Sequence, residues 1–159
     1  MARVVGIDHL SIRVSDYEKS KAFYGRLFAF LGFEVEAEYP GTMGWKNGHT
    51  LFWIGQAETG GRKKFHVGDV GIHHYAFRLR SRKDVDDLDK FLREELKATI
   101  VDPAGEYYDD YYAVFFLDPD GIPRLSENPT SPPCESVRTR LYRTAWSNPA
   151  SSTLNRGKI

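Results

Sequence analysis

An internal repeat constrains the fold of this 159-residue chain more than any other feature of its sequence. Residues 6–14 read GIDHLSIRV, and residues 71–79, which begin 65 positions later, read GIHHYAFRL. In both segments apolar and polar side chains alternate, which is typical of a strand with one buried face. Leu10, Ile12 and Val14 share the apolar face of the first segment. A repeated strand of this kind predicts two similar modules that bury a common core.

Each repeated strand is followed by a segment with helical periodicity. Ser15 and Ser81 stand three residues before Glu18 and Asp84, as N-cap residues do in a capping box. Gly32 is placed to end the first helix. The apolar stripes consist of Ala22, Phe23, Leu27, Phe30 and Leu31 in the first helix and Val85, Leu88, Leu92 and Leu96 in the second. Both stripes predict helices that cover a sheet.

Three short strands are expected after each helix. They span 33–38, 42–46 and 49–55 in the first half and 98–102, 111–117 and 122–127 in the second half. Asn47-Gly48 and Asp120-Gly121 have the chemistry of hairpin turns, because these residues tolerate positive φ. The sequence therefore predicts an α+β fold in which a βαβββ module is used twice.

The domain organisation follows from this pattern. We expect one domain over residues 1–127, with modules at 4–55 and 71–127 that are joined by a linker at 56–70. Residues 128–159 are rich in Pro, Ser, Thr and Asn and carry five basic side chains against one acidic side chain. Such a composition predicts a poorly structured basic tail.

The charge balance excludes several classes of partner. The chain has 22 Lys and Arg against 22 Asp and Glu. Nucleic acids and anionic membranes attract proteins with a basic excess, so we expect no nucleic-acid partner and no membrane partner. No apolar run approaches the roughly 20 residues of a membrane-spanning helix. The single Cys134 has no partner for an intrachain disulfide, so we expect a reducing, cytoplasmic location.

Four motifs then carry a resemblance to a known superfamily. They are Asp8-His9 in the first repeated strand, Ser20…Phe23-Tyr24…Leu31-Gly32-Phe33 in the first helix, His73-His74 in the second repeated strand, and YYAVFF at 111–116 followed by DPDG at 118–121. Together with the repeat, they make residues 4–127 similar to the vicinal oxygen chelate (VOC) superfamily, which includes glyoxalase I, extradiol dioxygenases and the bleomycin- and fosfomycin-resistance proteins. The resemblance implies that the two modules pair into a cup-shaped, curled mixed sheet that holds a small-molecule substrate or ligand.

The resemblance also implies a set of metal ligands. Metal-dependent members of the superfamily take ligands from the first strand of each module and from the last strand. Carried over to this sequence, this pattern implies His9 and His74 as ligands, with Glu127 as a third. Such a set suits Fe(II) or Mn(II), and Ni or Zn are further candidates for the divalent metal. A histidine on a strand also serves structural roles, and this alternative stays open.

The last strands depart from the family pattern. Members with a metal usually carry Glu four residues after the Gly of DPDG, and that position is Leu125 here. Glu127 lies two residues further on, on the same face of a strand, and a bulge near Pro123 would bring it into place. The equivalent position in the first module is Phe52, and Gln56 would serve as a ligand with a shifted register.

Two functions from different classes follow from the resemblance. The first is a metal-dependent enzyme of the glyoxalase or dioxygenase type, a lyase or a dioxygenase that chelates two neighbouring oxygens of a small substrate. Its general base is not assigned. The second is a metal-free protein of bleomycin-resistance type that binds or sequesters a small molecule such as a drug. An interaction protein that uses the basic tail is a third alternative, and a homodimer in which a second chain completes the cup is left open.

Four residues are candidates for substrate binding. Arg13 and Arg78 occupy equivalent positions of the repeat and would point into the cup. There they would bind either protein carboxylates or an anionic group of the substrate, because an isolated buried charge is costly. Phe52 and Tyr111 would line an apolar pocket, or they would belong to the core.

Overall fold

The computed structural model describes residues 3–4, 6–58, 65–66, 68–108 and 111–129. The expected basic tail from residue 130 onward and the middle of the expected linker, residues 59–64, lie outside the described residues. Within the described residues, no helix is long and apolar enough to cross a membrane.

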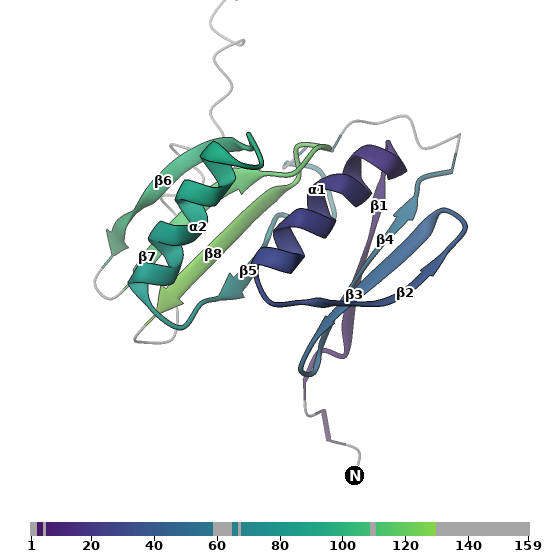
Figure 1. Cartoon of the computed structure of the whole chain (residues 1–159), viewed down its shortest axis with the longest axis horizontal. Coiled ribbons are helices and arrows are strands. Elements are labelled where there is room, and N and C mark those ends of the chain that lie inside the picture. Colours follow the sequence, from purple (N-terminus) through teal and green to yellow (C-terminus); the bar gives the residue numbers. More distant parts are fainter. Residues whose placement is uncertain (1–2, 5, 59–64, 67, 109–110, 130–159) are drawn as a thin grey trace, which may run out of the picture.

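The first module is a four-stranded sheet covered by one helix (Figure 1). Its elements in chain order are β1 (His9–Val14), α1 (Tyr17–Phe30), β2 (Glu34–Tyr39), β3 (Thr42–Asn47) and β4 (Thr50–Gln56). The strand order in the sheet is β1-β4-β3-β2. β1 and β4 are parallel, as the crossover through α1 requires, and the other neighbours are antiparallel.

The second module repeats this topology. Its elements are β5 (Tyr75–Arg78), α2 (Arg82–Glu94), β6 (Thr99–Tyr108), β7 (Tyr111–Leu117) and β8 (Pro123–Pro129). The strand order is β5-β8-β7-β6, with β5 parallel to β8. The predicted α+β fold with a repeated βαβββ unit is therefore confirmed.

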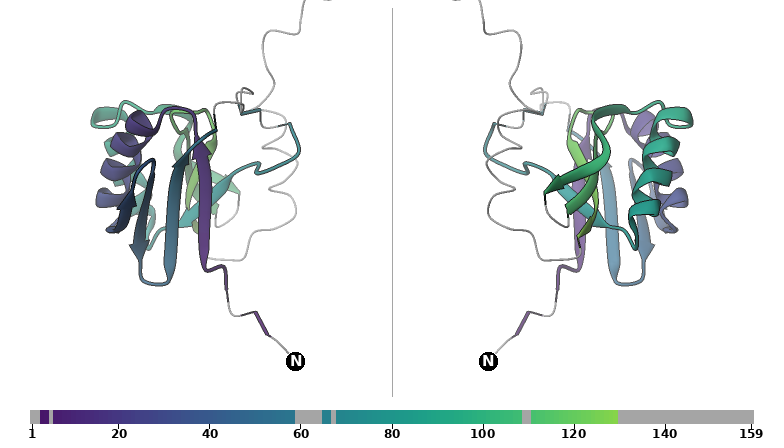
Figure 2. Two further views of the ribbon diagram at one scale, coloured as in Figure 1. Left: turned by 90° about the vertical axis from the view of Figure 1, so that its right-hand side faces the viewer. Right: turned by 90° about the vertical axis from the view of Figure 1, so that its left-hand side faces the viewer.

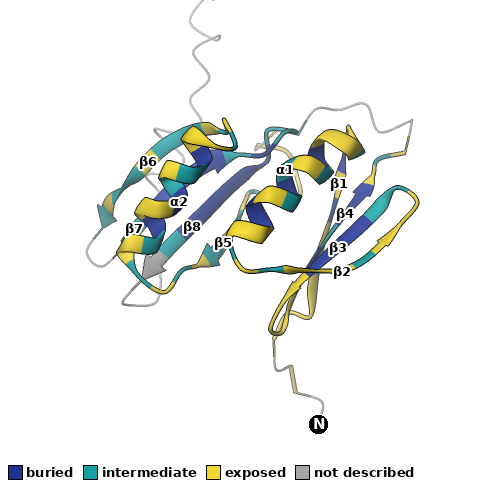
Figure 3. Ribbon diagram, viewed as in Figure 1, coloured by how far each residue is buried: buried dark blue, intermediate teal, exposed yellow. Residues whose placement is uncertain are grey.

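Both helices lie on the same side of the two sheets (Figures 1 and 2). Along β1, Ile12 and Val14 are buried in the core, whereas His9, Ser11 and Arg13 are exposed. The alternation expected from the sequence is thus present, and burial is concentrated between the helices and the central strands (Figure 3). We call the face of the sheets that is turned away from the helices the cup face.

The helix ends agree with the sequence at α2 but not at the start of α1. Ser81 caps α2 as predicted, because its side chain accepts a hydrogen bond from the backbone N–H of Asp84. The prediction of Ser15 as the cap of α1 is wrong. Asp16 caps α1 through the N–H of Lys19, which leaves Ser15 free for a contact with the second module.

The apolar stripe predicted for α1 is also partly wrong. The buried residues of α1 are Ser20, Tyr24, Leu27 and Phe28, whereas Ala22 and Phe30 are exposed. The helix is rotated so that Tyr24, with its polar hydroxyl, faces the second module. In α2 the predicted stripe is confirmed for Val85, Leu88 and Leu92, which are buried, whereas Leu96 lies beyond the end of the helix and is half-buried.

β6 is twice as long as the predicted strand at 98–102. It continues to Tyr108 because register shifts accommodate the segment between Asp102 and Gly105, which contains Pro103. Bulges and proline are tolerated here because β6 is an edge strand, so Pro103 need not donate a ladder hydrogen bond.

The two observed caps allow a direct test of the local structure. We expect Asp16→Ala and Ser81→Ala each to lower the free energy of unfolding by about 1 kcal/mol, because each removes the acceptor of an N-terminal helix N–H. Urea denaturation followed by circular dichroism measures this difference. Equal stability of Ser81→Ala and wild type would contradict the assignment of the α2 cap.

Candidate functional site

The two modules meet through an aromatic cluster in the core. Phe28 and Phe52 of the first module pack against Tyr75 and Phe77 of the second. The ring centroids of Phe52 and Tyr75 are 5.1 Å apart, and those of Phe28 and Phe77 are 5.9 Å apart. Phe52, a predicted substrate-binding residue, is only 1% exposed and forms part of this cluster.

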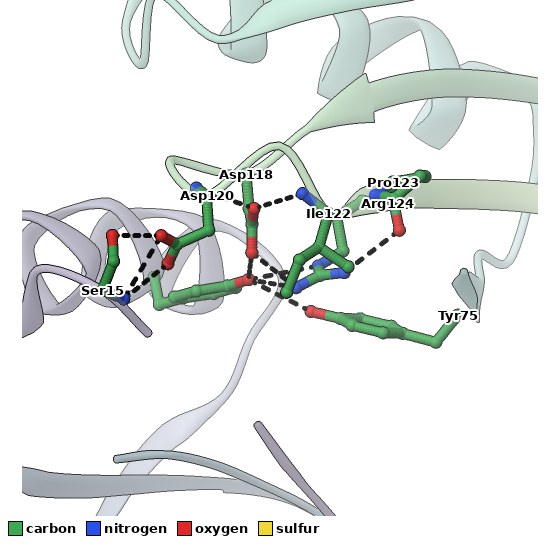
Figure 4. Close-up of polar contacts among 8 residues, drawn as sticks. Ser15, Tyr75, Asp118, Asp120, Ile122, Pro123 and Arg124 are labelled. Carbon is green, nitrogen blue, oxygen red and sulfur yellow. Dashed lines mark hydrogen bonds and ion pairs between the residues drawn. The ribbon is translucent and has the colours of Figure 1, made fainter. Parts of the chain in front are cut away.

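A buried polar network lies beside the aromatic cluster (Figure 4). Arg124 of β8 is 1% exposed, and its Nη2 donates to Oδ2 of Asp118 at 2.6 Å. The Tyr24 hydroxyl of α1 donates to the same oxygen at 2.5 Å and accepts from Nε of Arg124 at 3.1 Å. Cζ of Arg124 lies over the ring of Tyr75, 3.8 Å from its centroid. We call these four residues the seam network.

The polar atoms of Asp118 and Arg124 in the seam network have further hydrogen-bond partners in the backbone. Oδ1 of Asp118 accepts from the backbone N–H groups of Asp120 and Ile122 at 3.0 and 2.7 Å, and Nη1 of Arg124 donates to the carbonyl of Pro123. Burial raises the pKa of Asp118, and Arg124 and the Tyr24 hydroxyl oppose this shift. A buried ion pair is tolerated when further hydrogen bonds complete its shell, which is the case here.

A second contact joins the modules at the DPDG turn. The carboxylate of Asp120 accepts from the backbone N–H of Ser15 at 3.1 Å and from its hydroxyl (Figure 4). The two aspartates of this motif therefore bind different parts of the first module. Asp118 binds Tyr24 of α1, and Asp120 binds Ser15 in the connection between β1 and α1. In the sequence the motif indicated only a turn and a family resemblance.

A cleft of about 540 Å³ lies between the edge strands β1 and β5. Apolar residues make up most of its lining, among them Leu10, Leu31, Phe33, Phe52, Phe77 and Leu79. Asp8, His9 and Arg78 supply charged or ionisable groups in the same cleft. Three of the seven residues nominated from the sequence, His9, Phe52 and Arg78, thus come together here.

The first strands of the two modules run in opposite directions. The cleft contains the start of β1 and the end of β5, whereas Arg13 at the end of β1 lines another cavity with Gly71 and Ile72, which lead into β5. This arrangement places His9 in the same cleft as Arg78. His74 lines a different and very small recess of about 10 Å³ that contains Leu125 and Phe115.

The three predicted metal ligands each have another partner. Nδ1 of His9 lies 2.8 Å from the carboxylate of Asp8, and Nδ1 of His74 lies 2.7 Å from Nδ1 of His73. Glu127 lies beside the Tyr111 hydroxyl, and burial together with this carboxylate raises the pKa of Tyr111. Among the described residues, no group of three or more His, Cys, Asp or Glu side chains is placed to hold a metal ion. Within the described part of the chain, His9, His74 and Glu127 are thus not brought together at one point, and their role as ligands stays a prediction.

Arg13 and Tyr111, the remaining nominated residues, lie apart from the cleft between the modules. Arg13 is exposed on the cup face of the first sheet. Tyr111 is 5% exposed and belongs to an apolar cluster with Ala113, Phe115 and Leu125. Leu125, which stands where metal-dependent members of the superfamily usually carry Glu, is thus an apolar side chain in an apolar cluster.

Sequence reasoning did not nominate Arg124 or Asp118. Arg124 lies in β8 among consecutive buried residues, so no alternation of polar and apolar side chains marks its position. The one available signal was the charge itself, since Arg124 follows Ile122-Pro123 in an otherwise apolar stretch close to Asp118.

Comparisons with known proteins agree with this fold. The family model described as Glyoxalase/Bleomycin resistance protein/Dioxygenase superfamily matches residues 6–123. The uncharacterized protein YqjT of Bacillus subtilis (strain 168) is 30% identical over 117 residues, which cover 72% of this chain and 91% of that protein. The chain therefore belongs to the glyoxalase/bleomycin resistance protein/dioxygenase superfamily.

Solved structures of similar fold include proteins with different descriptions. A proposed glyoxalase from Bacillus halodurans is 30% identical and superposes with a TM-score of 0.67 over 77% of this chain and 95% of that chain. The lactoylglutathione lyase of Agrobacterium tumefaciens is 20% identical, with a TM-score of 0.59 over 80% of this chain and 96% of that chain. At 20% identity the second likeness concerns the fold alone.

The seam network predicts a large effect for the loss of one charge. We expect Asp118→Asn to lower the free energy of unfolding by about 3–5 kcal/mol, because Arg124 would remain buried without a counter-charge. Tyr24→Phe keeps both charges and should cost about 1–2 kcal/mol. Urea denaturation measures both, with the exposed Asp87→Asn as a matched control that should change stability by less than about 0.5 kcal/mol. Equal effects of Asp118→Asn and Asp87→Asn would refute the role of the network.

The buried tyrosines predict a loss of stability at high pH. Burial raises the pKa of Tyr24, Tyr75 and Tyr111, and it raises the pKa of Tyr107 to about 12. An unfolded tyrosine ionises near about pH 10, so above this pH the folded chain holds protons that the unfolded chain has released. Stability should therefore fall between about pH 10 and about pH 12, and urea midpoints across this range should decrease. A flat profile would contradict the burial of these hydroxyls.

Proposed function

We propose that this protein binds a small, mainly apolar molecule in the cleft between its two modules and needs no metal ion to do so. Of the two functions that the resemblance implies, this is the metal-free binding function. The observation that carries the proposal is the cleft itself: a cavity of about 540 Å³ with an apolar lining and a few charged groups. Pockets of this size and character are typical of small-molecule sites.

The lining of the cleft suits a ligand that has one polar end. Leu10, Phe33 and Phe77 offer apolar surface, and burial of such surface provides most of the affinity for a small ligand. Arg78 and the Asp8–His9 pair would orient the polar end. These residues come from both modules of one chain, so we propose that one chain suffices to build the site.

The surroundings of the expected metal ligands favour binding without a metal. Leu125 is 2% exposed in an apolar cluster, so the position of the family carboxylate contributes no oxygen ligand. Glu127 lies beside Tyr111, and His9 and His74 line different cavities. A lyase or dioxygenase of the metal-dependent type would need these groups to converge on one ion.

Filling the cleft with a larger side chain tests the proposal. Ala76 is exposed and lines the cleft, so Ala76→Phe would occupy the cavity without opening a hole in the core. We expect the neutral dye N-phenyl-1-naphthylamine to bind the wild type with increased fluorescence, and Ala76→Phe to weaken this binding by about tenfold or more, a loss of about 1.4 kcal/mol.

The matched control places the same side chain elsewhere. Ala22 is exposed on α1 and does not line the cleft, so Ala22→Phe should bind the dye as the wild type does. Equal dye binding by Ala76→Phe and Ala22→Phe would contradict the cleft as the site. Dye binding that appears only after addition of a divalent metal would contradict the metal-free function.

A further inference from the structure

Two side chains on the cup face of the first sheet lie over glycines of the neighbouring strands. Arg13 in β1 pairs with Gly55 in β4, and Trp53 in β4 pairs with Gly44 in β3. A Cβ atom at Gly55 would overlap Nη1 of Arg13 and lie 3.4 Å from its Cζ. A Cβ atom at Gly44 would lie 2.5 Å from Cε3 of Trp53. The guanidinium and the indole therefore occupy the space that two missing side chains leave.

The backbone does not require glycine at either position. Gly41 and Gly48 in the adjoining turns have φ of 71° and 58°, in the left-handed region, but neither Gly44 nor Gly55 has a positive φ. A larger residue would fit the strand geometry at both positions. Glycine at Gly44 and Gly55 thus serves to seat the two neighbouring side chains against the sheet.

The indole extends an aromatic surface towards the edge of the sheet. The rings of Trp53 and Tyr39 are nearly parallel, with an interplanar angle of 15° and centroids 6.4 Å apart. Tyr39 is 60% exposed, and Trp53 is half-buried. The flat faces of such rings favour stacking with another aromatic ring.

The guanidinium of Arg13 is available to an anion. Arg13 is exposed and lines a cavity of about 380 Å³. Within the described residues, it takes part in no ion pair or hydrogen bond. Asp69 lines the same cavity, but its carboxylate lies 3.8 Å from Nδ1 of His66. Nη1 of Arg13 lies over Gly55, and the guanidinium carries further N–H donors that can bind a carboxylate at two points.

We propose that Arg13, Trp53 and Tyr39 form a binding site for an aromatic carboxylate. The ring of the ligand stacks on Trp53 and Tyr39, and its carboxylate binds Arg13. Gly55 pairs with Thr42, and Gly44 lies two residues further along β3, so the two glycines that seat the two groups are about 8 Å apart. An arylalkanoic acid with a short chain spans this distance. The site lies on the cup face of one sheet, so the inference is independent of the cleft between the modules.

The test uses three matched probes and the full-length chain. The probes are 3-phenylpropionate, its neutral analogue 3-phenyl-1-propanol, and the non-aromatic 3-cyclohexylpropionate. Binding is followed by the indole N–H resonance of Trp53 in ¹⁵N spectra, which Trp53→Phe assigns. We expect 3-phenylpropionate to shift this resonance and to bind about tenfold more tightly than either analogue, since each analogue lacks one of the two contacts.

Glycine substitutions separate the two halves of the site. Gly55→Ala displaces only the end of the Arg13 side chain, so it should weaken 3-phenylpropionate about tenfold and leave 3-phenyl-1-propanol unchanged. Gly44→Ala displaces the indole and should weaken both. Gly25 has no atom within 4 Å of its Cβ position, so Gly25→Ala is the matched control and should bind as the wild type does.

Two results would overturn the proposal. One is a Trp53 resonance that 3-phenylpropionate leaves in place in the folded wild type. The other is unchanged affinity for this acid in Gly55→Ala. If the spectrum of Gly55→Ala shows an unfolded chain, Arg13→Gln replaces it, with the same expected selectivity for the acid over the alcohol. Ala76→Phe should lose the dye and keep 3-phenylpropionate, whereas Gly55→Ala should keep the dye and lose 3-phenylpropionate. The two measurements therefore show separately whether the cleft or the site on the cup face has failed.

Discussion

The structure depends on one buried ion pair at the boundary between its two modules. Arg124 and Asp118 both belong to the second module, and the Tyr24 hydroxyl from α1 of the first module bonds to both of them. An unpaired charge at this depth would be very costly, so the two modules are held in the one arrangement that keeps all three groups bonded. The aromatic cluster of Phe28, Phe52 and Phe77 then fills the space beside them.

This arrangement determines which residues face each other across the cleft. The first strands of the modules run in opposite directions, so equivalent positions of the repeat do not meet. His9 shares a cleft with Arg78, and His74 lies in another recess with Leu125. Equivalent residues of a repeat therefore need not form one site. The result is a cleft with a mainly apolar lining and a few charged groups, which is typical of small-molecule sites.

The sequence predicted most of the fold and only part of the site. The 65-residue repeat and the alternation of residues 6–14 and 71–79 predicted both modules, because burial of one strand face depends on local pattern. The predicted N-cap of α1, Ser15, was one residue away from the observed cap, because Ser15 bonds to Asp120 of the other module. Arg124 was missed for the same reason: its place in the core depends on Tyr24, which is 100 positions away. Contacts between modules leave no periodic signal in the chain.

The metal content of the protein tests the central claim most directly. Untagged protein is purified without chelator, and Fe, Mn, Ni and Zn are measured by elemental analysis before and after reconstitution with each ion. The surroundings of His9, His74 and Leu125 predict no stoichiometric metal in the wild type, and no change in His9→Ala or His74→Ala. One metal ion per chain that is lost in both variants would contradict a metal-free function.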